Sequence, residues 1–240
     1  MAIVKPFKAV RATRDKVALV SSKSYEIYTP EMLDSKLAFN PYTFLHVINP
    51  GYKYHKQDVS GELRFKLVHN RYLEFKEDEI FTQDNTPAFY IYQKITPSNS
   101  FCGIISATSV EDYTNNVIKK HEGTLKSREL LFENYLKNTG FNAEPVLLTY
   151  PDNDVIANII KKYQQQRAEY EFSTTDKDTH LLWVVDNKND VEQITEAFKE
   201  IDTLYIADGH HRSTSSCLLA QNIAKENPNH TGKEDYNFFM

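Results

Sequence analysis

From Pro145 onward, short apolar segments alternate with segments of helical periodicity, and this alternation restricts the fold more than any other feature of the chain. The apolar segments, each of the right length for one strand, cover residues 145–150, 180–185 and 204–207. The helical segments cover residues 153–167, 190–200 and 213–226. Strands that alternate with helices form sheets covered by helices. The sequence therefore predicts an α/β (mixed α+β) fold: a mixed sheet with flanking helices, in which the strand ending at Ala207 is central.

The first 140 residues are less regular. Apolar runs predict strands over residues 44–47, 88–92 and 103–107. Helical periodicity predicts helices over residues 58–76, 112–120 and 127–138, the last ended by Gly140. A further helix is expected to begin at Thr29-Pro30-Glu31, because Thr is a good N-cap, Pro suits the first helical position and Glu favours the positive end of the dipole. No linker is visible, so residues 1–240 are expected to form one globular unit.

Composition restricts the class of protein. The chain is 40% hydrophobic, which is enough to bury a core. Its formal net charge of -5 disfavours nucleic acid as a partner, and none is expected. The two distant cysteines predict no disulfide framework, and no apolar stretch is long enough for a membrane span or a signal core. A cytoplasmic protein is therefore expected. The apolar end Phe238-Phe239-Met240 indicates the N-terminal part of a longer protein.

The apolar strand over residues 204–207 leads directly into the polar sequence Asp208-Gly209-His210-His211-Arg212. Ligands of open α/β sheets bind at the carboxyl ends of strands. Gly209 permits a tight turn, Arg212 offers a two-pronged cation, and the helix expected from Ser213 begins with N–H groups that attract anions. The pattern predicts a site for an anionic group such as a nucleotide phosphate. Two alternatives stay open: a polar turn whose histidines cap carbonyls, and a metal site of Asp208, His210 and His211.

A second charged group lies in the loop between two expected helices, with His121 and Glu122 followed by Lys126 and Arg128. A His–Glu pair beside two cations can position a proton acceptor near a charged substrate. A solvated loop between helices has the same composition, so this alternative also stays open. We expect His121 and Glu122 to line one pocket with the turn formed by residues 208–212.

Several blocks of the sequence resemble a widespread bacterial family of unknown function whose mark is Ala-Asp-Gly-His-His-Arg. The matching blocks span nearly the whole chain and comprise residues 40–47, 112–113, 121–122 with Thr124, 145–150, 182–185 and 207–212. That family is similar to the ParB/sulfiredoxin superfamily, which includes an ADP-dependent free-serine kinase. The chain departs from the family pattern at Glu26, where aspartate is expected, and at Ser213, where an aromatic residue is expected.

The resemblance implies a ParB/sulfiredoxin-like core and the use of a nucleotide, ADP or ATP, with Mg²⁺. It also implies that Gly209, His210, His211 and Arg212 contact the nucleotide phosphates. Asp208 resembles the acid that lies next to the metal or the substrate in the serine kinase.

Together these features predict a nucleotide-binding protein, and more specifically a phosphotransferase (kinase) for a small hydroxylated metabolite. Phosphoryl transfer needs cations that clamp the phosphates, a metal and a base. Arg212 with Lys126 or Arg128 would clamp, Asp208 would hold Mg²⁺, and Glu122 or Glu26 would act as the base.

Two other functions use overlapping residues. A non-catalytic, nucleotide-gated binding module needs the same phosphate turn but no base. A redox repair role like that of sulfiredoxin needs a reactive cysteine beside the signature arginine; here His211 occupies that place, and Cys217 lies further along the next helix.

Overall fold

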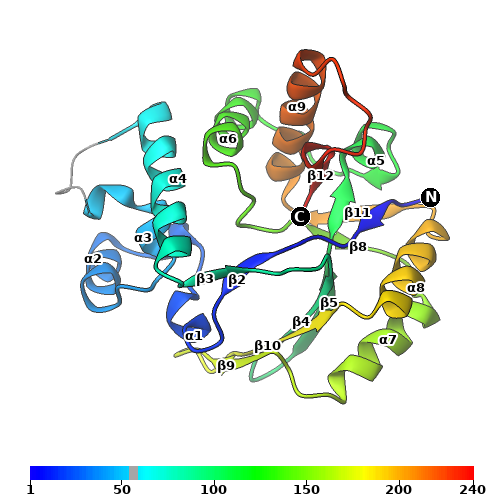
Figure 1. The fold of residues 1–240 in the computed structure, drawn as a ribbon, viewed down its shortest axis with the longest axis horizontal. Coiled ribbons are helices and arrows are strands. Elements are labelled where there is room, and N and C mark those ends of the chain that lie inside the picture. Colours follow the sequence, from blue (N-terminus) through cyan, green and yellow to red (C-terminus); the bar gives the residue numbers. More distant parts are fainter. Residues whose placement is uncertain (54–58) are drawn as a thin grey trace.

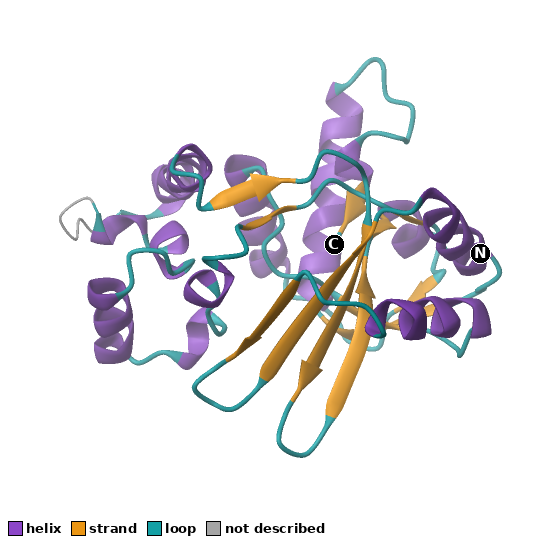
Figure 2. Ribbon diagram, turned by 60° about the horizontal axis from the view of Figure 1, so that its bottom comes forward, coloured by secondary structure: helices purple, strands orange, loops and turns teal. Residues whose placement is uncertain are grey.

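The computed structural model describes residues 1–53 and 59–240, and these form a mixed α/β fold (Figure 1). Its largest sheet is antiparallel, and Figure 2 shows its four strands side by side. In spatial order these strands are β5 (Ser100–Ile105), β4 (Phe89–Ile95), β10 (Thr179–Val185) and β9 (Tyr170–Ser173). The helices α7 (Asp154–Gln164) and α8 (Lys188–Lys199) bring Ile156 and Ile194 into the same buried cluster as Ile91 and Trp183. This apolar burial anchors the central part of the fold.

A three-stranded mixed sheet carries the residues of functional interest. Its central strand, β11 (Leu204–Asp208), runs parallel to β7 (Ile118–Lys119) and antiparallel to β8 (Leu147–Thr149). Leu204 and Ile206 are buried and belong to the main core. The central position expected for the strand that ends near Ala207 is therefore confirmed.

Helices gather around this sheet. The helix α9 (His210–Glu226) follows β11 after a single residue, and α6 (Lys126–Thr139) and α5 (Val110–Thr114) pack against α9 (Figure 1). Gly140 ends α6 in the left-handed conformation, with φ 73°, as its role as a helix terminator predicts.

Short strands bring the ends of the described chain together. One three-stranded sheet has the order β1 (Val4–Lys5), β6 (Ala107–Ser109) and β12 (Phe238–Phe239), and β2 (Val10–Ala12) pairs with β3 (Phe81–Gln83). The 3₁₀ turns cover Tyr25–Ile27, Pro50–Tyr52 and Asp235–Asn237.

The N-terminal helices surround a second, smaller buried cluster that includes Val47, Val68 and Phe75. These helices are α1 (Val17–Val20), α3 (Leu45–Ile48) and α4 (Gly61–Glu77), and α2 (Pro30–Phe39) packs against α3. The expected start of α2 is confirmed: the Oγ1 of Thr29 accepts a hydrogen bond of 3.3 Å from the Met32 N–H, and Pro30 is the first helical residue. The helix expected over residues 58–76 corresponds to α4, although residue 58 lies outside the described residues.

Two expectations about local structure are wrong. Residues 44–47, expected as a strand, lie largely in the short helix α3. The turn before it explains the error: the Asn40 Oδ1 accepts from the Tyr42 N–H at 3.0 Å and the Thr43 Oγ1 from the Leu45 N–H at 3.4 Å, so the chain continues to curl.

The helix expected over residues 112–120 also ends early. Helix α5 stops at Thr114, and Asn116 takes a positive φ of 60°, which interrupts the helical path. Ile118 and Lys119 then pair with Leu204 and Tyr205 as strand β7. A long-range strand pairing has overridden the local helical pattern.

A largely buried ionic network connects the two-stranded sheet of β2 and β3 to the four-stranded sheet. The guanidinium of Arg11 contacts both carboxylate oxygens of Asp84, at 2.8–3.0 Å, and the Glu169 carboxylate at 3.0 Å. The Tyr90 hydroxyl donates to Asp84 at 2.7 Å, and Arg11 donates to the Tyr170 hydroxyl at 2.6 Å. Only 19% of the Arg11 side chain and 14% of the Asp84 side chain are exposed. Each charge is therefore largely removed from water and compensated by the other.

Among the helices of the described residues, none combines the length and the apolar character that crossing a membrane would require.

Candidate functional site

A single glycine connects strand β11 to helix α9. Gly209 takes φ 98° and ψ 28°, in the left-handed region, and α9 begins at His210. The helix thus starts three residues earlier than the expected start at Ser213, so residues 210–212 form its first turn. A Cβ atom at position 209 would lie 3.1 Å from the Nε and 3.3 Å from the Cζ of Arg212. Glycine therefore serves both the backbone turn and the close approach of the guanidinium.

The Arg212 side chain folds back over this turn and binds several oxygen atoms. It donates to the Asp208 carboxylate, to the Pro145 carbonyl at 2.8 Å and to the Glu144 carboxylate at 3.4 Å. About 28% of the Arg212 side chain is exposed, against 70% for Asp208 and 64% for Glu144. The guanidinium is therefore the less exposed member of each pair, and both of its carboxylate partners stay in contact with solvent.

Glu144 and Pro145 were not expected at the site. They precede β8, which is brought beside β11 by antiparallel pairing of Leu148 with Ile206. The chain separation of 68 residues between Glu144 and Arg212 left no local signal for this contact.

The loop between β7 and α6 contacts the start of α9. The Leu125 N–H donates to the Nε2 of His211 at 3.2 Å, which requires this nitrogen to be unprotonated. Nearby, the Tyr113 hydroxyl and the Thr214 Oγ1 form a hydrogen bond of 2.6 Å, and the Lys120 ammonium lies 3.6 Å from the centroid of the Tyr113 ring. Residues 121–128 and 208–212, the two charged segments that the sequence singled out, are thus in direct contact.

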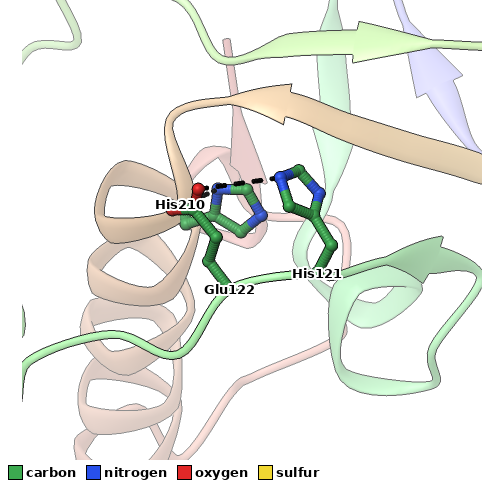
Figure 3. A group of neighbouring side chains, drawn as sticks. All are labelled: His121, Glu122 and His210. Atoms are coloured by element: carbon green, nitrogen blue, oxygen red, sulfur yellow. Dashed lines mark ion pairs between the residues drawn. The ribbon is translucent and has the colours of Figure 1, made fainter.

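The same contact brings His210 close to His121 and Glu122. Figure 3 shows the Glu122 carboxylate facing both imidazole rings. Its oxygens lie 3.7 Å from the His121 Nε2 and 3.7 Å from the His210 Nδ1. The two rings meet edge to face, with centroids 4.4 Å apart. His210 is 6% exposed, whereas the side chains of His121 and Glu122 are 59% and 65% exposed.

The hydroxyl groups that follow in α9 bond to the helix itself. The Ser213 N–H and hydroxyl both donate to the Gly209 carbonyl, and the Thr214 and Ser215 hydroxyls donate to the carbonyls of His210 and His211. Ser213 is also fully buried. Ser213, expected at the helix start where N–H groups attract an anion such as phosphate, thus has no free donor in this conformation.

The other candidate residues lie in different surroundings. Lys126 and Arg128 are exposed in the first turn of α6, directly after the loop that reaches His211. Glu26 is exposed in the 3₁₀ turn Tyr25–Ile27, between α1 and α2, and forms no hydrogen bond or ion pair with the turn at Gly209 within the described ranges. Among the proposed carboxylate bases, only Glu122 contacts the start of α9.

Cys217 lies inside the protein. It is 4% exposed, its Sγ donates to the Val110 carbonyl at 3.8 Å, and burial raises the pKa of its thiol to about 12. A reactive cysteine needs an accessible thiolate. These features disfavour the sulfiredoxin-like redox role for this residue.

The fold and the site define a mixed α/β protein whose charged and imidazole side chains meet where β11 enters α9. The model of the family described as "Protein of unknown function (DUF1015)" matches residues 4–240, and the chain belongs to that family. No match was found among curated proteins or among solved structures.

Proposed function

We propose that the start of α9 binds a phosphate group of a nucleotide, ADP or ATP with Mg²⁺, and that the protein transfers a phosphoryl group to a small hydroxylated metabolite. A ParB/sulfiredoxin-like core is part of this proposal. Its basis is that residues 209–212 resemble the phosphate-binding turn of that superfamily.

The observation that carries the proposal is that the first turn of α9 has no side-chain cap and lies beside the guanidinium of Arg212. No side chain caps this helix, and its first turn holds no acidic residue. The first N–H groups of a helix have no partner within the helix, and the dipole makes this end favourable for anions. Arg212 adds a planar cation that matches a phosphate with two parallel hydrogen bonds.

An incoming phosphate must compete with the present partners of Arg212. Asp208 and Glu144 are both more than half exposed, so each can turn toward water when a phosphate takes its place. Asp208 then supplies the single carboxylate that, with phosphate oxygens, suits Mg²⁺. Glu122 is the base that the geometry favours, because it lies beside His210 in the first turn of α9.

The same exchange supports a second candidate function, the non-catalytic, nucleotide-gated module. The segment that precedes β8 is attached to Arg212 by the Glu144 carboxylate and the Pro145 carbonyl, and displacement of both by a phosphate would free it. Binding would then change the conformation of a surface loop without any chemical step.

A thermal-shift panel tests nucleotide binding. We expect ADP or ATP with Mg²⁺, at about 100 times the dissociation constant, to add roughly 2.7 kcal/mol of stability. For a chain of this length that corresponds to a rise in Tm of about 5–10 °C. Nucleosides without phosphate are the matched control and should give no shift. An equal shift with adenosine, or no shift with any nucleotide at millimolar concentration, would contradict the phosphate site.

Detection of a phosphorylated product separates the two candidate functions. The enzyme should convert nucleotide in the presence of an accepted small alcohol, and Glu122→Gln should abolish this turnover while nucleotide binding persists. Binding without turnover across a broad panel of hydroxylated metabolites would favour the gated module.

A further inference from the structure

We propose that His121, Glu122 and His210 form a binding site for one divalent transition-metal ion, with Zn²⁺ as its best-fitting occupant. Each residue offers one ligand atom, and these atoms all lie within 4.8 Å of one another. Three atoms this close surround a point no more than about 2.8 Å from each, and Zn–N bonds measure roughly 2.0–2.1 Å. Small side-chain rotations therefore complete the coordination. This inference rests on these residues alone and not on the proposed phosphotransfer.

The surroundings of His210 provide independent support. The ring is nine-tenths buried, yet neither ring nitrogen forms a hydrogen bond within the described part of the chain. The Nε2 is buried without a partner, and the Nδ1 faces the Glu122 carboxylate at 3.7 Å, beyond hydrogen-bond distance. Buried polar side chains in native proteins nearly always have a partner. The buried ring therefore has nitrogen atoms that no described group engages by a hydrogen bond, and a cation shared with His121 and Glu122 would bind one of them.

The three residues come from segments that the fold holds in place. His210 is the first residue of α9, fixed by the left-handed turn at Gly209. His121 and Glu122 belong to the loop that the Leu125 N–H attaches to His211. Figure 3 shows both imidazole rings and the carboxylate directed at a common region. The arrangement does not depend on an unattached surface loop.

The ligand types select the class of ion. Two imidazoles with one carboxylate suit Zn²⁺ and related transition metals, whereas Mg²⁺ prefers oxygen ligands alone. Three protein ligands also leave at least one coordination position for water or a substrate atom, as in catalytic zinc sites. The side chains of His121 and Glu122 are more than half exposed, so this position is accessible from solvent. The site is distinct from the Mg²⁺ position proposed at Asp208, whose carboxylate pairs with Arg212.

Metal titration of the whole chain tests the proposal. Protein stripped with a chelator is titrated with ZnCl₂ by calorimetry, and with CoCl₂ while the visible d–d absorption is recorded. We expect one ion per chain and Co²⁺ bands typical of four or five ligands. His121→Ala and Glu122→Gln change exposed side chains and should fold. Each should weaken Zn²⁺ binding by more than about 100-fold, since loss of an outer-shell partner alone costs 10–100-fold.

A matched control is His230→Ala. His230 also pairs with a carboxylate, that of Glu234 at 3.4 Å, but belongs to no group of three potential ligands within the described ranges. Its substitution should leave Zn²⁺ affinity unchanged. If His121→Ala and Glu122→Gln bind Zn²⁺ as tightly as the wild type, or if binding is equally weak in all variants, the site is refuted and the cluster is an edge-to-face contact beside a solvated carboxylate.

The metal alone is the probe, so this result is separate from that of the nucleotide experiments. If Glu122 is a metal ligand, Glu122→Gln releases the ion in the absence of nucleotide. If Glu122 is only the base for phosphotransfer, the same variant binds Zn²⁺ no differently from the wild type, which refutes the metal site, and it loses turnover. The two proposals can therefore fail independently.

Discussion

Arg212→Ala is expected to weaken binding of a phosphate-containing ligand by about 10- to 150-fold, which corresponds to roughly 1.5–3 kcal/mol for one charge-assisted contact. The guanidinium lies against Gly209 at the start of α9, where it and the uncapped N–H groups would bind the proposed phosphate together. Arg212→Lys should recover only part of the affinity, because an ammonium cannot make two parallel hydrogen bonds. Equilibrium dialysis with radiolabelled nucleotide measures both changes.

The matched control removes a positive charge elsewhere. Lys199 on α8 forms an exposed pair with Glu196 at 2.6 Å, and Lys199→Ala should change nucleotide affinity by less than about twofold, since exposed pairs and screened charges contribute little. If Arg212→Ala binds as tightly as Lys199→Ala, the guanidinium does not hold the phosphate.

Asp84→Ala is expected to lower the free energy of unfolding by about 3 kcal/mol, because it leaves the largely buried Arg11 without its principal partner. Loss of one member of a buried pair costs about 3–5 kcal/mol, and the lower end applies here since Glu169 still contacts Arg11. The variant also removes the acceptor of the Tyr90 hydroxyl. Urea unfolding, followed by circular dichroism, measures the difference.

Asp235→Ala provides the comparison for that experiment. Asp235 also pairs with a cation, the Lys5 ammonium at 3.3 Å, but its side chain is fully exposed. Exposed pairs contribute at most about 1 kcal/mol, so this variant should unfold close to the wild-type urea concentration. If Asp84→Ala and Asp235→Ala lose equal free energy of unfolding, burial of the Arg11 network does not determine its contribution to stability.

Local patterns in the sequence predicted several elements of the fold. The capped start of α2 at Thr29, the end of α6 at Gly140 and the buried strand β11 each follow from a few neighbouring residues. The mixed α/β class followed from their order along the chain. One error occurs where distant residues decide, at Ile118, whose strand pairing with Leu204 replaced an expected helix. The other, at residues 44–47, comes from local turn contacts that the apolar pattern did not reveal.

The candidate site was predictable only in its parts. Residues 208–212 and the pair His121–Glu122 carry recognisable chemistry, and the sequence suggested that they meet. It did not indicate that His210 would be the buried member beside Glu122, because that depends on α9 beginning at His210 instead of Ser213. The contact of Arg212 with Glu144 depends on the pairing of β8 with β11, which no local pattern encodes.

The most direct test of the central claim is a titration of the ¹⁵N-labelled protein with ADP and ATP in the presence of Mg²⁺, followed by amide resonances in NMR spectra. A phosphate on the first turn of α9 must hydrogen-bond the N–H groups at its start. We predict that the amide resonances of residues 209–212 show the largest shifts and saturate together. Adenosine should leave these resonances in place. If no resonance moves at millimolar nucleotide, or if the largest shifts lie away from the β11–α9 turn, the account of this site is contradicted.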